Sequence, residues 1–308
     1  MKRRAKRKAT PAPVVAVDLG GTKIAAALVT AAGRVGPVHE EPVETTLPEA
    51  PFEQILRIAR ELQRGARTAP SAIGVAVPGL VRRDGTVWAP NLPGWDAVPL
   101  ARLLTRKLKM RAVVESDRNA AAIGEAWRGA ARGKDDVIVL IVGTGIGAGI
   151  LSGGRLVRGA HELSGCAGWM VVTDERSELA KRVGSLESSV AGPAIARAGH
   201  GREGASLAAA ARQGDAEARG IFTRAGRRLG VAVANLASLF DPEAIVLTGG
   251  VASAADLFLD ELKRSALEHG QPLSMPKIDI VVTELGARAN LLGAARLALD
   301  AASERKAK

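Results

Sequence analysis

Apolar residues along the chain gather in short runs that end at glycine-rich or polar turns. Residues 13–36 are typical of a strand, a glycine turn and a second strand, and the polar turn at Ala32–Gly33 predicts a third strand. Residues 52–66 carry apolar positions at helical spacing and predict a helix. Residues 71–81 then predict a buried strand that ends at a Pro-Gly turn, and residues 110–133 indicate a strand followed by a helix.

The same order returns in the second half of the chain. Residues 135–159 predict a strand, a glycine turn, a second strand, a Ser-Gly-Gly turn and a third strand. A helical pattern covers residues 214–240, residues 241–253 predict a strand ending at a Gly-Gly turn before a helix, and residues 289–304 predict a last helix. The period is too long for a solenoid. The duplication instead predicts an α/β protein with two similar domains that face each other across a cleft.

We expect the first domain to comprise residues 14–118 with the helix at 289–303, and the second to comprise residues 119–288. Basic tails are expected at residues 1–13, with six Lys or Arg and no acid, and at residues 304–308, with three bases and one acid. The net charge of +11 therefore falls to +3 outside the tails, which is ordinary for an enzyme. We expect disordered, solubilising tails and no specific nucleic-acid binding; a weak tether to nucleic acid or an acidic surface is the alternative.

Composition narrows the class of protein further. The chain has 308 residues, of which 47% are hydrophobic, enough for a sizeable core. Its single cysteine excludes an internal disulfide, so we expect a reducing, cytoplasmic compartment. No apolar run approaches the roughly 20 residues that span a bilayer. The basic N-terminus lacks the apolar region of a signal peptide and contains Pro11 and Pro13, so neither membrane insertion nor export is expected.

The first glycine turn has the chemistry of a phosphate site. The stretch DLGGTK places Gly20 and Gly21 between two strands, where their amides can approach phosphate oxygens. Thr22 adds a hydroxyl and Lys23 a positive charge, and Asp18 is placed to hold a magnesium ion through water. The stretch is not a P-loop, because it lacks the Gly-x₄-Gly-Lys-Ser/Thr spacing.

The second half carries two more glycine turns. GTGIGAG contains Gly143, Thr144 and Gly145, and it fits a loose dinucleotide fingerprint. That fingerprint needs a helix directly after the turn, whereas the residues here alternate as in a hairpin, so we predict a second phosphate-binding turn. Gly249 and Gly250 follow a strand in TGGV, a position suited to a nucleotide base or ribose.

Together the motifs resemble the ROK family (repressors, open reading frames and kinases), which includes bacterial glucokinases, and the resemblance covers about residues 14–300. The motifs that carry it are, in order, DLGGTKI, GVAVPGLV, APNLPGW, SDRNAAAIGEAW, GTGIGAGI, RGAHELSGCAGWM, GSLESSVAG, IVLTGGV and LLGAARLA. The resemblance implies the actin-like ATPase (ribonuclease H-like) fold of sugar kinases, hexokinases and actin. It also implies a homodimer.

The resemblance implies ATP-dependent phosphorylation of a sugar hydroxyl, with Mg²⁺ near Asp18. The family's catalytic base is the Asp of an Asn-Asp-x-Asn-Ala stretch, which corresponds here to Asp117 in SDRNA. Taken alone, an Asp at that point is more often a helix N-cap. The family's sugar contacts correspond to Asn91 in APNLPGW and to Glu187 in GSLES.

Three further sugar-contact positions depart from the family pattern. The Asn before the base is Ser116, and in GCAGW the family's Glu and His positions are Cys166 and Trp169. Family members hold a structural zinc with that His and three cysteines. Here Ser185 stands at the last of the cysteine positions and the other cysteines are missing, so zinc is expected to be absent. We favour core packing for Trp169 over stacking on a sugar face, and a nucleophilic Cys166 is not expected.

Several functions remain open at this point. The first is a sugar kinase, and the second is a non-catalytic nucleotide or sugar sensor of the same fold, favoured by the altered contacts. The acceptor is a hexose, an acyl-amino sugar or a polyol, and the donor is ATP or polyphosphate. A DNA-binding repressor is disfavoured, because only about a dozen residues precede the first strand, too few for a helix-turn-helix.

Overall fold

The computed structural model describes residues 12–174 and 177–304, so the predicted basic tails lie almost wholly outside the described residues. The chain divides into two compact units. The first holds the described residues up to Asp117 together with those from Ala294 onward. The second is Arg118–Gly293.

The first unit is built on a mixed five-stranded sheet in the order β3-β2-β1-β4-β7. β1 pairs antiparallel with β2 and parallel with β4, and β7 continues the parallel side. Its elements are β1 (Val14–Leu19), β2 (Lys23–Val29), β3 (His39–Pro42), α1 (Ala50–Gly65), β4 (Ala72–Val77), β5 (Leu80–Val81), β6 (Val87–Trp88), α2 (Leu100–Leu108) and β7 (Arg111–Ser116). The short strands β5 and β6 pair only with each other.

Helices cover both faces of this first sheet. Apolar positions of α1 and α2, such as Ile55 and Leu104, are completely buried in one core with the strands. On the sheet's other side, Gly74 of β4 lies so close to α10 (Arg288–Glu304) that an added Cβ would sit 1.9 Å from the Ala294 carbonyl oxygen. A larger side chain at position 74 would therefore push the helix off the sheet.

The second unit repeats the strand order of the first: β10-β9-β8-β11-β12. In each sheet the first strand to appear in the chain lies in the middle, with two antiparallel strands on one side and two parallel strands on the other. The strands are β8 (Val137–Val142), β9 (Ile146–Ser152), β10 (Arg155–Leu156), β11 (Ala244–Thr248) and β12 (Asp279–Val282). The helices are α3 (Asp117–Arg128), η1 (Ala167–Trp169), α4 (Glu178–Val183), α5 (Ser185–Val190), α6 (Gly192–Ala198), α7 (Gly204–Arg212), α8 (Ala216–Phe240), η2 (Gly250–Leu257), α9 (Leu259–His269) and η3 (Met275–Lys277).

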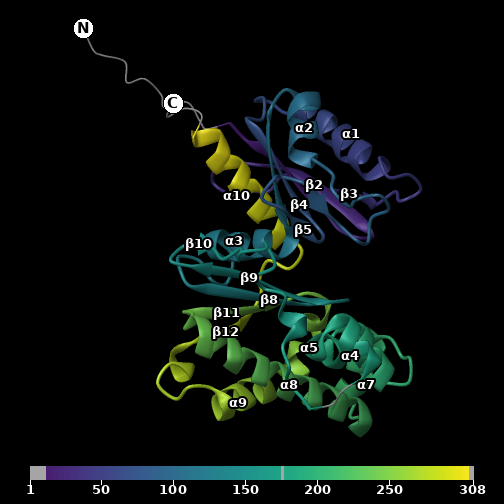
Figure 1. Ribbon diagram of the computed structural model, residues 1–308, viewed down its shortest axis with the longest axis vertical. Helices are drawn as coiled ribbons and strands as arrows, with labels where there is room; N and C mark the ends of the chain where they lie inside the picture. Colours follow the sequence, from purple (N-terminus) through teal and green to yellow (C-terminus); the bar gives the residue numbers. More distant parts are fainter. Residues whose placement is uncertain (1–11, 175–176, 305–308) are drawn as a thin grey trace. The chain divides into compact units, whose positions relative to one another are not determined.

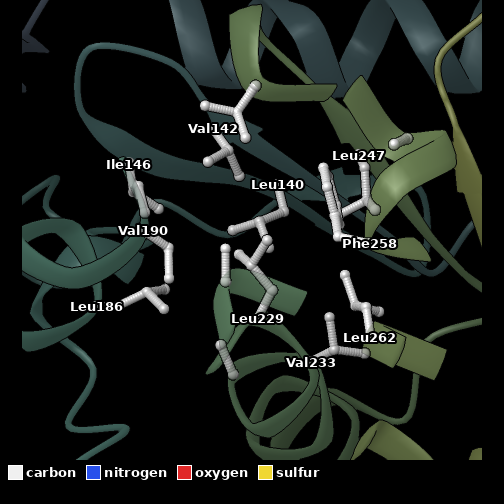
Figure 2. Packing of buried hydrophobic residues seen from close by; sticks show 14 of the residues in the cluster. Leu140, Val142, Ile146, Leu186, Val190, Leu229, Val233, Leu247, Phe258 and Leu262 are labelled. Atoms are coloured by element: carbon white, nitrogen blue, oxygen red, sulfur yellow. The ribbon is translucent and has the colours of Figure 1, made fainter. Parts of the chain in front are cut away.

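The second sheet is also covered on both faces. Figure 1 shows α8 and α9 on one side of β8 and β11 and α3 on the other. Alternate residues of β8 divide accordingly, since Leu140 packs with α8 and α9, and Val139 packs with α3. Figure 2 shows the larger core, which draws side chains from strands, from α5 and from the α8–α9 pair: Leu140, Val142, Ile146, Leu186, Val190, Leu229, Val233, Leu247, Phe258 and Leu262.

The predicted strands and long helices are present, with two differences in detail. The third strand, β3, begins at His39, several residues beyond the turn that Gly33 makes with a φ of 78°. The segment after the Gly-Gly turn is first a 3-10 helix, η2, which is interrupted at Ala254, and the α-helix, α9, begins only at Leu259. No helix among the described residues has the length and apolar character needed to cross a bilayer.

Candidate functional site

The first glycine turn joins β1 to β2 in the first unit. Gly20, Gly21 and Thr22 lie between the two strands, and the Gly20 amide donates to the Lys23 carbonyl (2.9 Å). Gly21 and Thr22 are exposed, so their backbone groups are accessible to a ligand. Lys23 is also exposed, but its Nζ lies 3.0 Å from Glu40 Oε2. The turn thus presents amides and a hydroxyl, with its lysine already paired.

Asn91 lies beside this turn. An added Cβ at Gly21 would be 3.9 Å from the Asn91 Cβ. The loop that carries Asn91 is held by Trp95, which is 1% exposed and donates from Nε1 to the Pro48 carbonyl (2.8 Å). A buried anchor four residues away therefore fixes an exposed amide next to the first phosphate turn.

Asp117 follows β7 directly and is the first residue of α3. Strands β1, β4 and β7 are parallel, so Asp18 near the end of β1 and Asp117 after β7 lie at the same edge of the sheet. Two strand spacings, about 10 Å, separate those strands. Ser116 is only 2% exposed, and its amide donates to Glu115 Oε1 (2.9 Å). The structure thus brings Asp18, Asn91 and Asp117 to one edge, while Ser116 is buried below it.

The second phosphate turn follows β8 in the second unit. The Gly143 amide donates to the Gly145 carbonyl (2.9 Å), and the Gly143 carbonyl accepts from the Gly192 amide (2.8 Å) at the start of α6. The Gly250 amide nitrogen lies 4.0 Å from the place of a Cβ on Gly143. Gly249 has a φ of 95°, and its added Cβ would lie 2.5 Å from the Val142 carbonyl oxygen, so a larger residue does not fit. The two predicted turns are therefore neighbours at the carboxyl ends of β8 and β11.

Glu187 connects this turn to the segment that holds Cys166 and Trp169. Its Oε2 accepts a hydrogen bond from the Ile146 amide (2.7 Å). The same oxygen lies 3.0 Å from the place of a Cβ on Gly145 and 3.0 Å from that on Gly168. One carboxylate oxygen thus fills the space between the phosphate turn and η1.

The core-packing interpretation of Trp169 is wrong. Trp169 is 57% exposed, and Val171, two residues later, is 73% exposed. Its backbone, rather than its ring, is packed: Gly184 fits against it so closely that a Cβ there would lie 2.6 Å from the Trp169 Cα. The ring lines a pocket of about 440 Å³, whose other walls are Val171, Thr173, Asp174, Ser177, Ala180, Lys181, Gly184 and Ser185. Cys166 is a partly buried free thiol at the start of the same segment.

A second pocket, of about 550 Å³, opens beside the phosphate turns of the second unit. Its volume is in the range of ligand pockets. It is lined by Gly143, Thr144, Gly192, Pro193, Ile195, Gly204, Ala205, Ala208, Arg212, Phe222, Gly250, Val251, Ser253 and Ala254. Three of these residues, Gly143, Thr144 and Gly250, were predicted from the sequence, because only the turn glycines and Thr144 carry a local signal. The α7 residues and Arg212 come from a helix that we did not predict.

A larger cavity, of about 610 Å³, lies elsewhere on the second unit. Lys134, Asp241, Pro242 and Glu243 line it, and they precede β8 and β11. It therefore lies at the amino ends of the parallel strands. Open α/β sheets bind ligands at the carboxyl ends. The 550 Å³ pocket, which touches both glycine turns, is accordingly the candidate ligand site.

Comparison with known proteins shows which enzymes this chain is similar to. Glucokinase of Streptomyces coelicolor is 34% identical over 314 residues, 93% of this chain and 97% of that protein. The bifunctional enzyme NanE/NanK of Brucella melitensis is 37% identical over 294 residues, 93% of this chain and 54% of that enzyme. The chain thus spans about half the length of that relative.

The solved structures confirm the predicted fold. A ROK family glucokinase from Streptomyces griseus, crystallised with glucose and AMPPNP, superposes with a TM-score of 0.78 at 32% identity, covering 94% of this chain and 99% of that one. The α/β fold of actin-like sugar kinases is therefore present here. The family model for ROK proteins matches residues 14–301. This chain belongs to the ROK family.

Proposed function

We propose that this chain phosphorylates a hydroxyl group of a sugar, with ATP as phosphate donor. The observation that carries the proposal is the arrangement of glycine turns at the carboxyl ends of both sheets, with Asp117 at the same edge as the first turn. Its relatives support it, since glucokinases are among them and one was crystallised with glucose and AMPPNP.

Each glycine turn has backbone amides that suit phosphate oxygens of the donor. Close approach requires residues without a Cβ, and Gly20, Gly21, Gly143, Gly145, Gly249 and Gly250 meet that need. The 550 Å³ pocket beside Gly143 and Gly250 would take the remainder of the nucleotide. Thr22 and Thr144 offer hydroxyls to phosphate oxygens.

Asp18 fits a magnesium ion by the chemistry of its donor atoms. Mg²⁺ in kinases is held by one or two carboxylates, by water and by the substrate phosphates, and Asp18 supplies one carboxylate beside the first phosphate turn. The ion would neutralise charge that develops on the phosphate oxygens. No three His, Cys, Asp or Glu side chains within residues 12–174 and 177–304 come close enough to form a protein-only metal site.

Asp117 is the proposed base. Its carboxylate would accept the proton of the acceptor hydroxyl while the hydroxyl oxygen forms a bond to the γ-phosphorus. The bond between that phosphorus and the oxygen bridging the β- and γ-phosphates breaks, which leaves ADP and the sugar phosphate. Asn91, which lies beside the first turn in the same unit as Asp117, would orient the acceptor through hydrogen bonds to its other hydroxyls. Ser116 would act indirectly, since it is buried.

The experiment measures ADP release with Mg-ATP across hexoses, N-acyl hexosamines and polyols. We expect turnover on at least one acceptor, and a reduction in kcat of about 10²- to 10⁴-fold in Asp117→Asn. Binding of AMPPNP by calorimetry is the control and should be unchanged in that variant. A kcat in Asp117→Asn within about tenfold of the wild-type value would contradict the role of Asp117.

The alternative is a sensor that binds nucleotide without transfer. It is favoured by Cys166 and Trp169 at positions where the family has polar sugar contacts, and by the burial of Ser116. AMPPNP binding without ADP release on any acceptor would support it.

A further inference from the structure

Among the described residues that line the 550 Å³ pocket, Arg212 is the one charged side chain, and neither the turns nor the proposed chemistry uses it. Arg212, the last residue of α7, lines the pocket. Its Nε and Nη2 donate to the two carboxylate oxygens of Asp256 at 2.8 and 2.7 Å. Nη2 also lies 3.4 Å from the Ser253 carbonyl oxygen. The guanidinium thus ties α7 to η2 through three contacts.

The segment that Arg212 holds forms a wall of the pocket and is not a regular helix. η2 is a 3-10 helix, and Ala254 in its interior has φ −107° and ψ 21°. Gly250, Ser253 and Ala254 of this segment line the pocket, and Ser253 Oγ donates to the Gly250 carbonyl (2.7 Å). Since 3-10 turns have poorer hydrogen-bond geometry than α-helices, a side-chain tie has more influence on where this wall lies.

The pair is suited to hold geometry rather than to bind anions. A bidentate arginine–carboxylate contact fixes the plane of the guanidinium. The hydrogen bonds that Arg212 donates to Asp256 lower the pKa of Asp256 and raise the pKa of Arg212, so both stay charged and neutralise each other. A phosphate group would find little net positive charge there.

The lining of the pocket combines two kinds of chemistry. Gly143, Thr144 and Gly250 present turn backbone. Ile195, Ala208 and Phe222 present apolar side chains to the same pocket. A linear polyphosphate has no group that gains from an apolar wall, whereas the base of a nucleoside does.

We propose that the Arg212–Asp256 pair positions the η2 wall of the donor pocket and so sets how tightly the pocket holds the nucleoside part of the donor. Arg212 is a positioning residue that acts through Asp256 and Ser253. The proposal rests on the proposed function for the identity of the pocket, and it adds the residues that hold the wall in place.

The test compares two probes by calorimetry, Mg-AMPPNP and inorganic tripolyphosphate, on the full chain. We expect Arg212→Ala and Asp256→Ala each to weaken AMPPNP binding about 5- to 10-fold. Tripolyphosphate binding should change less, and in opposite directions in the two variants, because each leaves one charge unpaired. The exchanged pair, Arg212→Asp with Asp256→Arg, should restore AMPPNP affinity to within about threefold of the wild type. Far-ultraviolet circular dichroism checks that each variant is folded. Arg212→Lys keeps the charge but cannot make the bidentate contact, so it should show an intermediate loss of AMPPNP affinity.

A matched control lies on α10. Arg296 Nε donates to Asp300 Oδ2 at 2.9 Å, and the two side chains are 44% and 52% exposed, against 46% and 54% for Arg212 and Asp256. Arg296→Ala should leave both affinities unchanged, because this pair does not line the pocket.

Other outcomes would overturn the proposal. Loss in Arg212→Ala without loss in Asp256→Ala would mean that Arg212 contacts the nucleotide directly. Equal losses of affinity for both probes would mean that the pair supports the phosphate turns. Unchanged AMPPNP affinity in both variants would mean that the pair does not position the pocket. If the wild-type chain phosphorylates a sugar from polyphosphate and binds no AMPPNP, the role of the Arg212–Asp256 pair is contradicted, whereas sugar phosphorylation itself is supported.

Discussion

Glu187 illustrates how one side chain serves both a turn and a helix. Its Oε2 accepts from the Ile146 amide at 2.7 Å and fills the gap between Gly145 and Gly168. In Glu187→Ala that partly buried amide loses its acceptor, which costs about 1–3 kcal/mol. We expect the free energy of unfolding in urea to fall by that amount.

The companion variant Glu187→Gln separates the hydrogen bond from the charge. Its side-chain oxygen remains an acceptor for the Ile146 amide, so most of the lost stability should return. If Glu187→Gln is as unstable as Glu187→Ala, then the charge rather than the hydrogen bond holds the turn.

The two tryptophans Trp169 and Trp95 should respond oppositely to truncation. Trp169 is 57% exposed, so Trp169→Ala should change the free energy of unfolding by less than about 1 kcal/mol. Trp95 is 1% exposed, so Trp95→Ala should cost about 3–5 kcal/mol. Acrylamide quenching of the fluorescence should fall most in Trp169→Phe. A large loss of stability in Trp169→Ala would mean that the Trp169 side chain is packed in the core rather than exposed.

Sequence patterns predicted the glycine turns but not the side chains that hold the turns and the pocket walls in place. DLGGTK and GTGIGAG are local, and glycine spacing alone indicates a close approach. The hydrogen bond of Glu187 spans 41 residues and that of Arg212 spans 44, so no local pattern reports them. The exposure of Trp169 was missed for a different reason: large apolar side chains are usually buried, and the pocket beside it depends on tertiary packing.

At the scale of elements, α8 and α9 approach each other through glycine. A Cβ on Gly230 of α8 would lie 2.5 Å from the Leu262 carbonyl oxygen and 2.6 Å from the Ser265 Cβ. Overpacking of this kind costs roughly 1–3 kcal/mol, more than the helix propensity of alanine returns. Gly230→Ala should therefore destabilise the protein in thermal or urea unfolding.

Gly220 on the same helix provides the control. The nearest atom to its added Cβ is the end of the flexible Arg224 side chain, at 3.4 Å. Gly220→Ala should stabilise the helix by about 0.5–1 kcal/mol. The two substitutions are chemically identical, so opposite signs would isolate the packing effect, and equal signs would contradict it.

The same helix pair contains a pH-dependent contact. Arg264 and Arg227 hold the pKa of Glu261 at about 2, below its usual 4.5. A lowered pKa in the folded state stabilises it above about pH 4.5, and this contribution is lost as the pH falls from 4.5 towards 2. Because both arginine side chains are more than half exposed, solvent screens the contact, and the effect should be below about 1 kcal/mol. Glu261→Gln should lose less stability than the wild type between about pH 5 and pH 2.5; equal losses would contradict the contact.

Element boundaries show where local patterns suffice. The helices α1, α8 and α10 begin and end within two residues of the predicted ranges, because each has a long apolar stripe. Helix α2 was missed although Leu100, Leu104 and Leu108 recur at helical spacing and are buried. Helices α4, α5, α6 and α7 were not predicted, since they are short and their alanine-rich or polar sequences carry little periodicity. The candidate nucleotide pocket is lined by α6 and α7, so its outline was beyond reach from the sequence.

At the scale of the whole molecule, each unit repeats one sheet topology and contributes glycine turns at the carboxyl ends of its parallel strands. The repeat could be predicted because strand, turn and strand recur in the same order along the chain. The chain passes from one unit to the other after Asp117 and after Gly293. These two positions could not be predicted, because they depend on which helix packs on which sheet. That choice is made by close contacts such as Gly74 with Ala294, which leave no periodic signature.

Ligand binding should appear in the stability of the whole chain. A ligand that binds only the folded protein stabilises it by about 2.7 kcal/mol at 100 times its Kd. For a chain of this size we expect Mg-AMPPNP at that concentration to raise the Tm by roughly 5 °C. Asp117→Asn should show the same rise, because Asp117 is proposed to act on the acceptor and not on the nucleotide. Arg212→Ala should need 5- to 10-fold more ligand for an equal rise. If saturating Mg-AMPPNP leaves the Tm unchanged, the 550 Å³ pocket is not a nucleotide site, and the donor must be sought elsewhere.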